Sequence, residues 1–180
     1  QGTVTFIDAS ETGKTTTDGK CEYVLISYYA DAIVDTYSES SSTLKIYFKE
    51  NSADIKGNMK VDLDDEDVSL AFSYNGSKYS YDDIRQDDVF SLAYDVTGSF
   101  DKSSFYDIYV SRDTVEGRVQ GERNDDFGRK QYLIDGKYYL MSSSMDSSSL
   151  DVGTYYTLYL NAFGKIVKND ENSSNTLIGI

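Results

Sequence analysis

Apolar and polar residues alternate with a period of two along much of the chain. Because successive side chains of a strand point to opposite faces, such runs predict strands with one apolar face and one wet face. Strands of this kind are typical of antiparallel sheets that cover a core on one side. The clearest runs lie at 3–6, 43–48, 68–73, 90–94, 106–111 and 156–161.

Turn signals separate these runs. Asp18-Gly19, Asn75-Gly76 and Asp135-Gly136 favour tight hairpins, because both residue types tolerate positive φ. The chain contains no proline, so Gly, Asn and Asp mark the turns. Helical periodicity is nearly absent, although three short stretches leave a turn or two of helix open as an alternative. These stretches are 30–37, 81–85 and 142–150.

One order of features occurs twice: a hairpin turn, an Asp-Val pair, a strand and a glycine turn. The first copy begins at Asn75 and ends at Gly98, and the second begins at Asp135 and ends at Gly164. A weaker copy surrounds Asp18-Gly19. The pattern therefore predicts an all-β chain with little helix, built from small antiparallel barrel-like or sandwich-like modules in tandem. We place these modules at 1–57, 58–115 and 116–180.

Composition restricts the possible partners. The 180 residues include 31 acidic and 17 basic side chains, which gives a formal net charge of −14. This sign repels nucleic-acid phosphates and anionic membrane surfaces, so neither is an expected partner. No apolar stretch approaches the length of a membrane span, so direct membrane insertion is not expected. Gln1 leads directly into a strand-like run, and we expect the chain to be part of a longer protein.

The usual catalytic residue types are scarce. Histidine is absent, and Cys21 is the single cysteine, so no internal disulfide, thiolate metal cage or His-based catalytic pair is available. Gly13-Lys14-Thr15 resembles the end of a phosphate-binding loop, but Asp8 stands where that motif needs a glycine. We therefore predict no catalytic residues, no cofactor and no enzymatic activity.

A run of carboxylates at 62–67 is the leading candidate for a metal site, ahead of the acidic groups at 82–88 and 124–126. Calcium prefers clustered oxygen ligands, and the candidate ligands are Asp62, Asp64 and Asp65. The run is not an EF-hand, because Asp67 and Ser73 occupy the positions of the required glycine and acid. A weak surface calcium site and a solvated charged turn remain the two alternatives.

Tyrosine, with 17 copies, is the other candidate for binding. Exposed rings can stack on sugars, whereas cross-strand tyrosine pairs can simply stabilise a sheet. An outward row on one face would favour binding, and scattered or buried rings would favour a structural role. The candidates are Tyr74, Tyr79, Tyr81, Tyr138 and Tyr155.

Three motifs follow one another in the last third of the chain: Val115-Glu-Gly117-Arg-Val119, Asp135-Gly-Lys-Tyr138 and the run 157–166. In this order they resemble the β-rich modules that accompany S-layer homology domains in surface proteins of Gram-positive anaerobic bacteria. The resemblance covers roughly residues 60–180 and implies an exported, cell-wall or S-layer associated location, usually without an assigned activity. The S-layer homology anchor itself is not in this chain, so none of its wall-binding residues has a counterpart here.

Together these observations predict a non-catalytic structural or spacer segment of an exported bacterial cell-surface protein. The alternative is a carbohydrate-binding or cell-wall-binding module that uses the exposed tyrosines. The expected partners are accordingly cell-wall polysaccharide or other domains of surface proteins.

Overall fold

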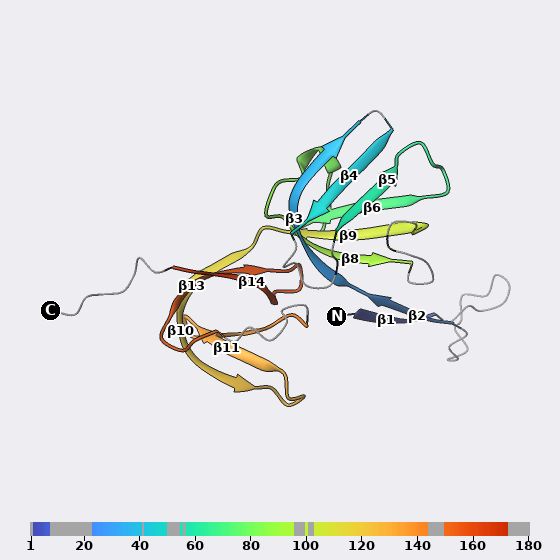
Figure 1. Ribbon diagram of the computed structural model, residues 1–180. Coiled ribbons are helices and arrows are strands. Elements are labelled where there is room, and N and C mark those ends of the chain that lie inside the picture. Colours follow the sequence, from blue (N-terminus) through green and yellow to red (C-terminus); the bar gives the residue numbers. More distant parts are fainter. Residues whose placement is uncertain are drawn as a thin grey trace.

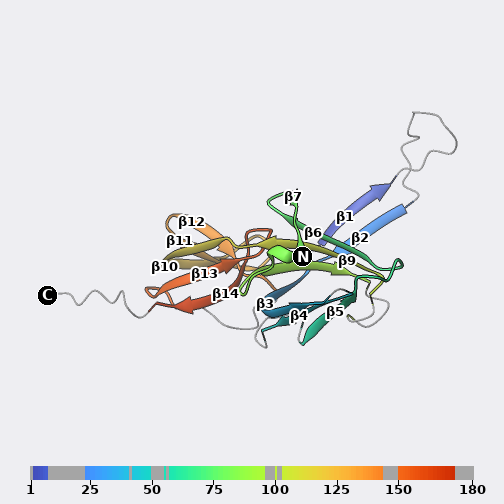
Figure 2. The same cartoon turned by 90° about the horizontal axis from the view of Figure 1, so that it is seen from above.

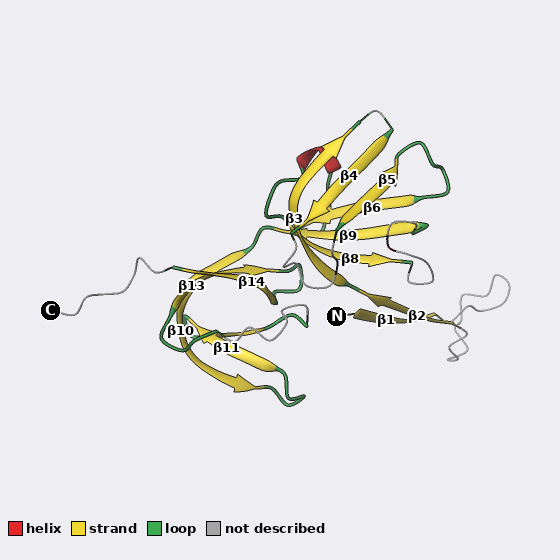
Figure 3. Ribbon diagram, viewed as in Figure 1, coloured by secondary structure: helices red, strands yellow, loops and turns green. Residues whose placement is uncertain are grey.

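The computed structural model describes residues 2–7, 23–40, 42–49, 55, 57–95, 100, 103–143 and 150–172. Its regular structure is almost entirely β (Figure 3), which confirms the predicted all-β class. The helical structure includes a 3-10 turn, η1 (Tyr81–Asp83). It begins after Ser80, whose hydroxyl accepts a hydrogen bond from the Asp82 amide. No helix among the described residues is long and apolar enough to span a membrane.

The largest sheet has seven strands in the order β5-β4-β3-β8-β9-β6-β7. Neighbouring strands are antiparallel except β6 and β9, which run parallel. The predicted turn at Asn75-Gly76 connects β6 to β7, and both residues have positive φ. The strands are β3 (Ala30–Glu39), β4 (Thr43–Phe48), β5 (Asn58–Asp62), β6 (Ser69–Tyr74), β7 (Ser77–Lys78), β8 (Val89–Tyr94) and β9 (Phe105–Ser111).

Strand β3 bends this sheet around its core. Its first half pairs with β8 and its second half pairs with β4, with a register shift between Val34 and Thr36. Extra residues at such shifts increase the local twist. The two parts of the sheet therefore fold toward each other over a core that includes Leu44, Phe90 and Ile108.

The helical alternative for residues 30–37 is wrong, because this segment is the first part of β3. Five consecutive residues, Ala30–Val34, are buried, so this stretch has no wet face and shows no period of two. Val34 belongs to the core of the seven-stranded sheet, whereas Ile33 packs with Val167 of a later strand. Burial on both faces removed the signal that identifies the other strands.

The second large sheet has five antiparallel strands in the order β12-β11-β10-β13-β14. Strand β10 pairs with β13 through its first half and with β11 through its second half. Met141, directly after β12, forms a parallel bridge with Ile166, so the two ends of the sheet meet at one point. The strands are β10 (Thr114–Asn124), β11 (Lys130–Ile134), β12 (Lys137–Leu140), β13 (Tyr155–Leu160) and β14 (Ile166–Glu171).

The remaining strands, β1 (Gly2–Ile7) and β2 (Tyr23–Tyr28), form an antiparallel pair. This pair extends away from both larger sheets, which form separate groups joined where the chain passes from β9 to β10 (Figures 1 and 2). The seven-stranded sheet draws strands from both sides of residue 57, and the three-module division stays a prediction from the repeat. Gly13-Lys14-Thr15, Asp18-Gly19 and Cys21 lie outside the described residues.

Candidate functional site

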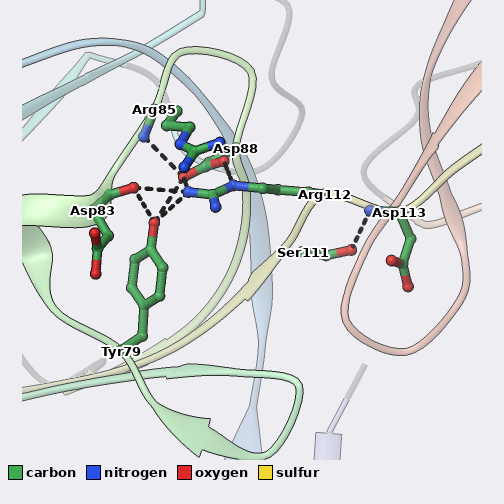
Figure 4. A network of polar contacts seen from close by, with 7 residues as sticks. All are labelled: Tyr79, Asp83, Arg85, Asp88, Ser111, Arg112 and Asp113. Atoms are coloured by element: carbon green, nitrogen blue, oxygen red, sulfur yellow. Dashed lines mark hydrogen bonds and ion pairs between the residues drawn. The ribbon is translucent and has the colours of Figure 1, made fainter.

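A buried aspartate next to β8 holds the link between the two large sheets. Asp88 is 2% exposed, and its carboxylate accepts hydrogen bonds from Arg112 Nε at 2.6 Å and Nη2 at 2.9 Å. The Arg85 amide donates to the same carboxylate at 2.9 Å, and the Tyr79 hydroxyl lies 3.3 Å from it. Figure 4 shows the side chains of Arg112 and Tyr79 and the amide of Arg85 converging on Asp88.

This network changes the proton affinity of its members. Burial and the adjacent Asp88 carboxylate raise the pKa of Tyr79 to about 12. The hydrogen bond to Asp88 raises the pKa of Arg112 as well. Arg112 also donates to the Tyr79 hydroxyl and, at 2.7 Å, to the carbonyl of Asp83. The network therefore contains the ion pair between Arg112 and Asp88 and a Tyr79 hydroxyl that stays protonated at neutral pH. The raised pKa of Arg112 means that its guanidinium stays charged.

Arg112 lies in a very short connection. Strand β9 ends at Ser111 and β10 begins at Thr114, so Arg112 and Asp113 alone separate them. The Asp113 amide donates to the Ser111 hydroxyl at 3.2 Å (Figure 4). Contacts with one end of the seven-stranded sheet thus fix both residues of this connection, Arg112 and Asp113.

A second buried aspartate joins the sheets directly. Asp31 of β3 is 4% exposed and accepts hydrogen bonds from Ser91 of the neighbouring β8 at 2.8 Å and from Ser142 at 2.5 Å. The Asn161 amide nitrogen lies 3.1 and 3.0 Å from its two carboxylate oxygens. Ser142 and Asn161 belong to the five-stranded half of the molecule. We call the contact surface around Asp31 the junction.

Apolar and aromatic side chains continue the junction. Ile33 and Val89 of the seven-stranded sheet form a buried cluster with Val167 of β14. The Phe163 ring, in the turn between β13 and β14, lies 5.3 Å from the ring of Tyr29 and 6.1 Å from that of Tyr109. Burial and the adjacent Tyr109 and Asp107 raise the pKa of Tyr29, so its hydroxyl stays protonated.

Charged side chains close the rim of the junction. Lys49 pairs with Asp87 at 2.5 Å, and Lys168 of β14 lies 4.0 Å from the same carboxylate. Lys168 also pairs with Asp170 at 2.7 Å. The junction thus has an apolar layer within a charged rim, as specific interfaces usually do, and a buried carboxylate in addition.

The structure does not bring the five candidate tyrosines together. Tyr74, Tyr79 and Tyr81 are partly buried against the core of the seven-stranded sheet. Tyr138 lies in β12 and Tyr155 in β13, at opposite parts of the five-stranded sheet. The tyrosines are therefore scattered, and the three nearest one another are packed against the core.

The candidate calcium ligands lie at the end of β5 and in the turn that follows. Asp62, Asp64 and Asp65 are exposed. Asp62 Oδ1 accepts a hydrogen bond from the Asp64 amide at 3.1 Å, and Asp65 Oδ1 accepts one from the Asp67 amide at 3.0 Å. Within the described ranges, no group of three or more acidic, His or Cys side chains is placed to hold a metal ion.

Sequence reasoning did not single out the residues that build the junction. Asp31 gave one usable signal, because it is a lone acid inside the apolar stretch from Tyr29 to Val34. A charge in such a stretch must find partners when the stretch is buried. Arg112 and Asn161 gave no comparable signal, since their partners lie far away along the chain.

The fold and the junction define an all-β chain in which two sheets are held together by buried aspartates. Comparisons with models of protein families, with curated proteins and with solved structures find no match for this chain.

Proposed function

We propose that the chain is a non-catalytic structural spacer of an exported bacterial cell-surface protein. In this proposal each large sheet forms a small barrel-like or sandwich-like module, and the two modules behave as one rigid unit that sets the distance between neighbouring parts of the protein. The observation that carries it is Asp31, a buried carboxylate whose hydrogen-bond donors come from both sheets.

Rigidity is the property that a spacer needs, and the junction supplies its physical basis. Domains in one chain usually move relative to each other unless their interface is large or specific. Here the covalent connection is two residues long, and Arg112 within it is bound to Asp88. Separating the sheets would also expose Val89 and Val167 and leave Asp31 without the donors from Ser142 and Asn161.

The placement of the tyrosines supports the spacer over a sugar-binding row. The Tyr79 hydroxyl is hydrogen-bonded to Arg112 and Asp88. The Tyr74 ring packs against the Tyr79 ring at a distance of 5.9 Å. Such rings contribute to the stability of the sheet instead of presenting a flat platform. The expected partners are then other domains of the same surface protein.

The exported location rests on the resemblance to modules that accompany S-layer homology domains. An antibody raised against the purified chain tests it directly. We expect the antibody to label intact cells that carry the gene as strongly as it labels lysed cells. Labelling that appears only after lysis would overturn the proposed location.

Rigidity is tested by spin labels on the two sheets. We choose Lys60→Cys in β5 and Lys137→Cys in β12, both exposed, in a Cys21→Ser background. A single narrow distance distribution is expected from pulsed electron spin resonance. A broad distribution in the otherwise unmodified chain would overturn the spacer proposal.

Two variants of the labelled chain test whether the contacts of Asp31 cause the narrow distance distribution. Asp31→Ala removes the acceptor shared by Ser91, Ser142 and Asn161, and it is expected to broaden the distribution. Asp126→Ala removes an exposed carboxylate from a turn of the five-stranded half and is expected to leave the distribution unchanged.

A further inference from the structure

A cleft of about 570 Å³ lies on the five-stranded sheet, next to the junction. Its lining includes Gln131 of β11, Tyr138 of β12, and Phe163 and Lys165 from the turn between β13 and β14. Arg129, Leu140 and Gly164 complete the lining.

The charge of this cleft is opposite to that of the chain. The protein carries a formal net charge of −14, yet the charged residues that line the cleft are the cations Arg129 and Lys165. Arg129 is already bound to Asp125, with Nε to Oδ2 at 2.7 Å. Within the described part of the chain, no carboxylate oxygen lies within 4.0 Å of the Lys165 ammonium.

Lys165 is therefore a partly buried cation with a cation as its charged neighbour in the cleft. Burial and the nearby Arg129 lower the pKa of its ammonium, while Asp31 partly opposes this effect. An anion bound in the cleft would offset the unfavourable interaction between the two cations. The site thus favours a negatively charged ligand on electrostatic grounds.

The two aromatic side chains of the cleft, Tyr138 and Phe163, are held in place without a ligand. The Arg123 guanidinium lies 3.6 Å from the centre of the Tyr138 ring, and its Nε donates to Gln131 at 2.8 Å. The Phe163 ring packs against the Tyr29 ring at a centroid distance of 5.3 Å. Preorganised side chains lose little conformational entropy on binding, which favours affinity.

We infer that this cleft binds an anionic saccharide. The apolar face of a sugar ring packs on Tyr138 or Phe163, and its carboxylate or phosphate pairs with Lys165 and Arg129. This function is additional to the spacer and does not depend on it. Of the five tyrosines expected from the sequence, only Tyr138 takes part.

Binding is tested on the intact chain by isothermal titration and by NMR of backbone amides. The probes are oligogalacturonate, which carries carboxylates, a phosphomannan oligosaccharide, which carries phosphates on its sugar rings, and a neutral cello-oligosaccharide. Binding of one or both anionic probes, with shifts of the amides of Phe163–Lys165, is expected. If neither anionic probe binds, or if the neutral glycan binds as tightly, the inference is overturned. A response to only one anionic probe identifies the anionic group that is recognised.

Variants connect binding to the cleft. Lys165→Met is expected to weaken binding about tenfold or more, as is Arg129→Gln, because each loses a charge-assisted contact. Lys137→Met removes an exposed cation outside the cleft and is expected to change affinity less than about twofold. Equal losses in all three variants would show attraction by general charge and overturn the site. Circular dichroism identifies a variant that is misfolded. The affinity of the other cleft variant then decides whether the ligand binds in the cleft.

Discussion

Replacing Arg112 with methionine should destabilise the fold strongly, although the residue lies in a connection and not in a strand. Asp88 is 2% exposed and receives two hydrogen bonds from Arg112, whereas the arginine side chain is 24% exposed. Methionine keeps much of the aliphatic volume but removes the charge. The Asp88 carboxylate is then buried without its cation.

The magnitude follows from the contacts that remain. Removing one partner of a buried ion pair costs about 3–5 kcal/mol. Asp88 keeps the hydrogen bond from the Arg85 amide and its contact with Tyr79, and solvent reaches part of the arginine site. We therefore expect a loss of about 2–3 kcal/mol in the free energy of unfolding. For a chain of this size, that loss corresponds to a fall in melting temperature of about 4–12 °C.

Urea unfolding followed by far-ultraviolet circular dichroism measures this loss. Arg129→Met is the matched control, because Arg129 pairs with Asp125 but is 52% exposed, so its loss should stay below about 1 kcal/mol. Adding Asp88→Asn to Arg112→Met should recover about 1 kcal/mol by removing the unpaired charge. If Arg112→Met costs no more than the control, or if the double variant recovers nothing, the buried-pair reasoning is wrong.

Three further predictions concern packing, pH and calcium. Gly117→Ala should cost about 1–3 kcal/mol in thermal or urea unfolding, because a Cβ there would lie 2.6 Å from Ile134 Cγ2. Gly121→Ala in the same strand meets nothing within 4 Å, and an equal loss there would contradict this account. The folded state raises the pKa of Tyr79 from 10.0 to about 12, so its contribution is fully present below pH 10.0 and is lost as pH rises toward 12. Urea midpoints measured across this window should fall, and less so in Tyr79→Phe. Calcium should leave the melting temperature unchanged, since no three acidic side chains in the described ranges are placed to hold a metal ion. A rise in melting temperature that Asp65→Asn abolishes would restore the metal proposal.

The strands that sequence reasoning identified are those with one buried face. In β4 and β13, buried side chains alternate with more exposed ones, so the period of two survives in the sequence. The first half of β3 is buried on both sides by two different groups of residues, so its sequence shows no period of two. Without that period, the sequence allowed a helix as an alternative. The alternative at 81–85 was confirmed in part as the 3-10 turn η1, whereas residues 144–149 of the third stretch lie outside the described ranges.

The junction was beyond sequence reasoning for a different physical reason. Asp31 and Asn161 are 130 positions apart, and no local pattern records a hydrogen bond between such distant residues. Tyr79 was identified as a candidate, but its role depends on Arg112, which follows 33 positions later. The sequence indicates which side chains carry useful chemistry, and the long-range pairing decides which of them are free to use it.

The polar centre of the junction and the cleft beside it share one structural element. The turn between β13 and β14 supplies Asn161 to Asp31, Phe163 to the ring of Tyr29 and Lys165 to the cleft. Buried polar contacts stabilise less than well-packed apolar ones, but they require a single arrangement of donors and acceptors. A ligand that binds Phe163 and Lys165 therefore needs the turn in its docked position, and by linkage it stabilises that position. In the labelled chain carrying Asp31→Ala, saturating oligogalacturonate should consequently narrow the distance distribution again. A distribution that stays equally broad while the glycan is bound would show that the cleft and the junction are independent.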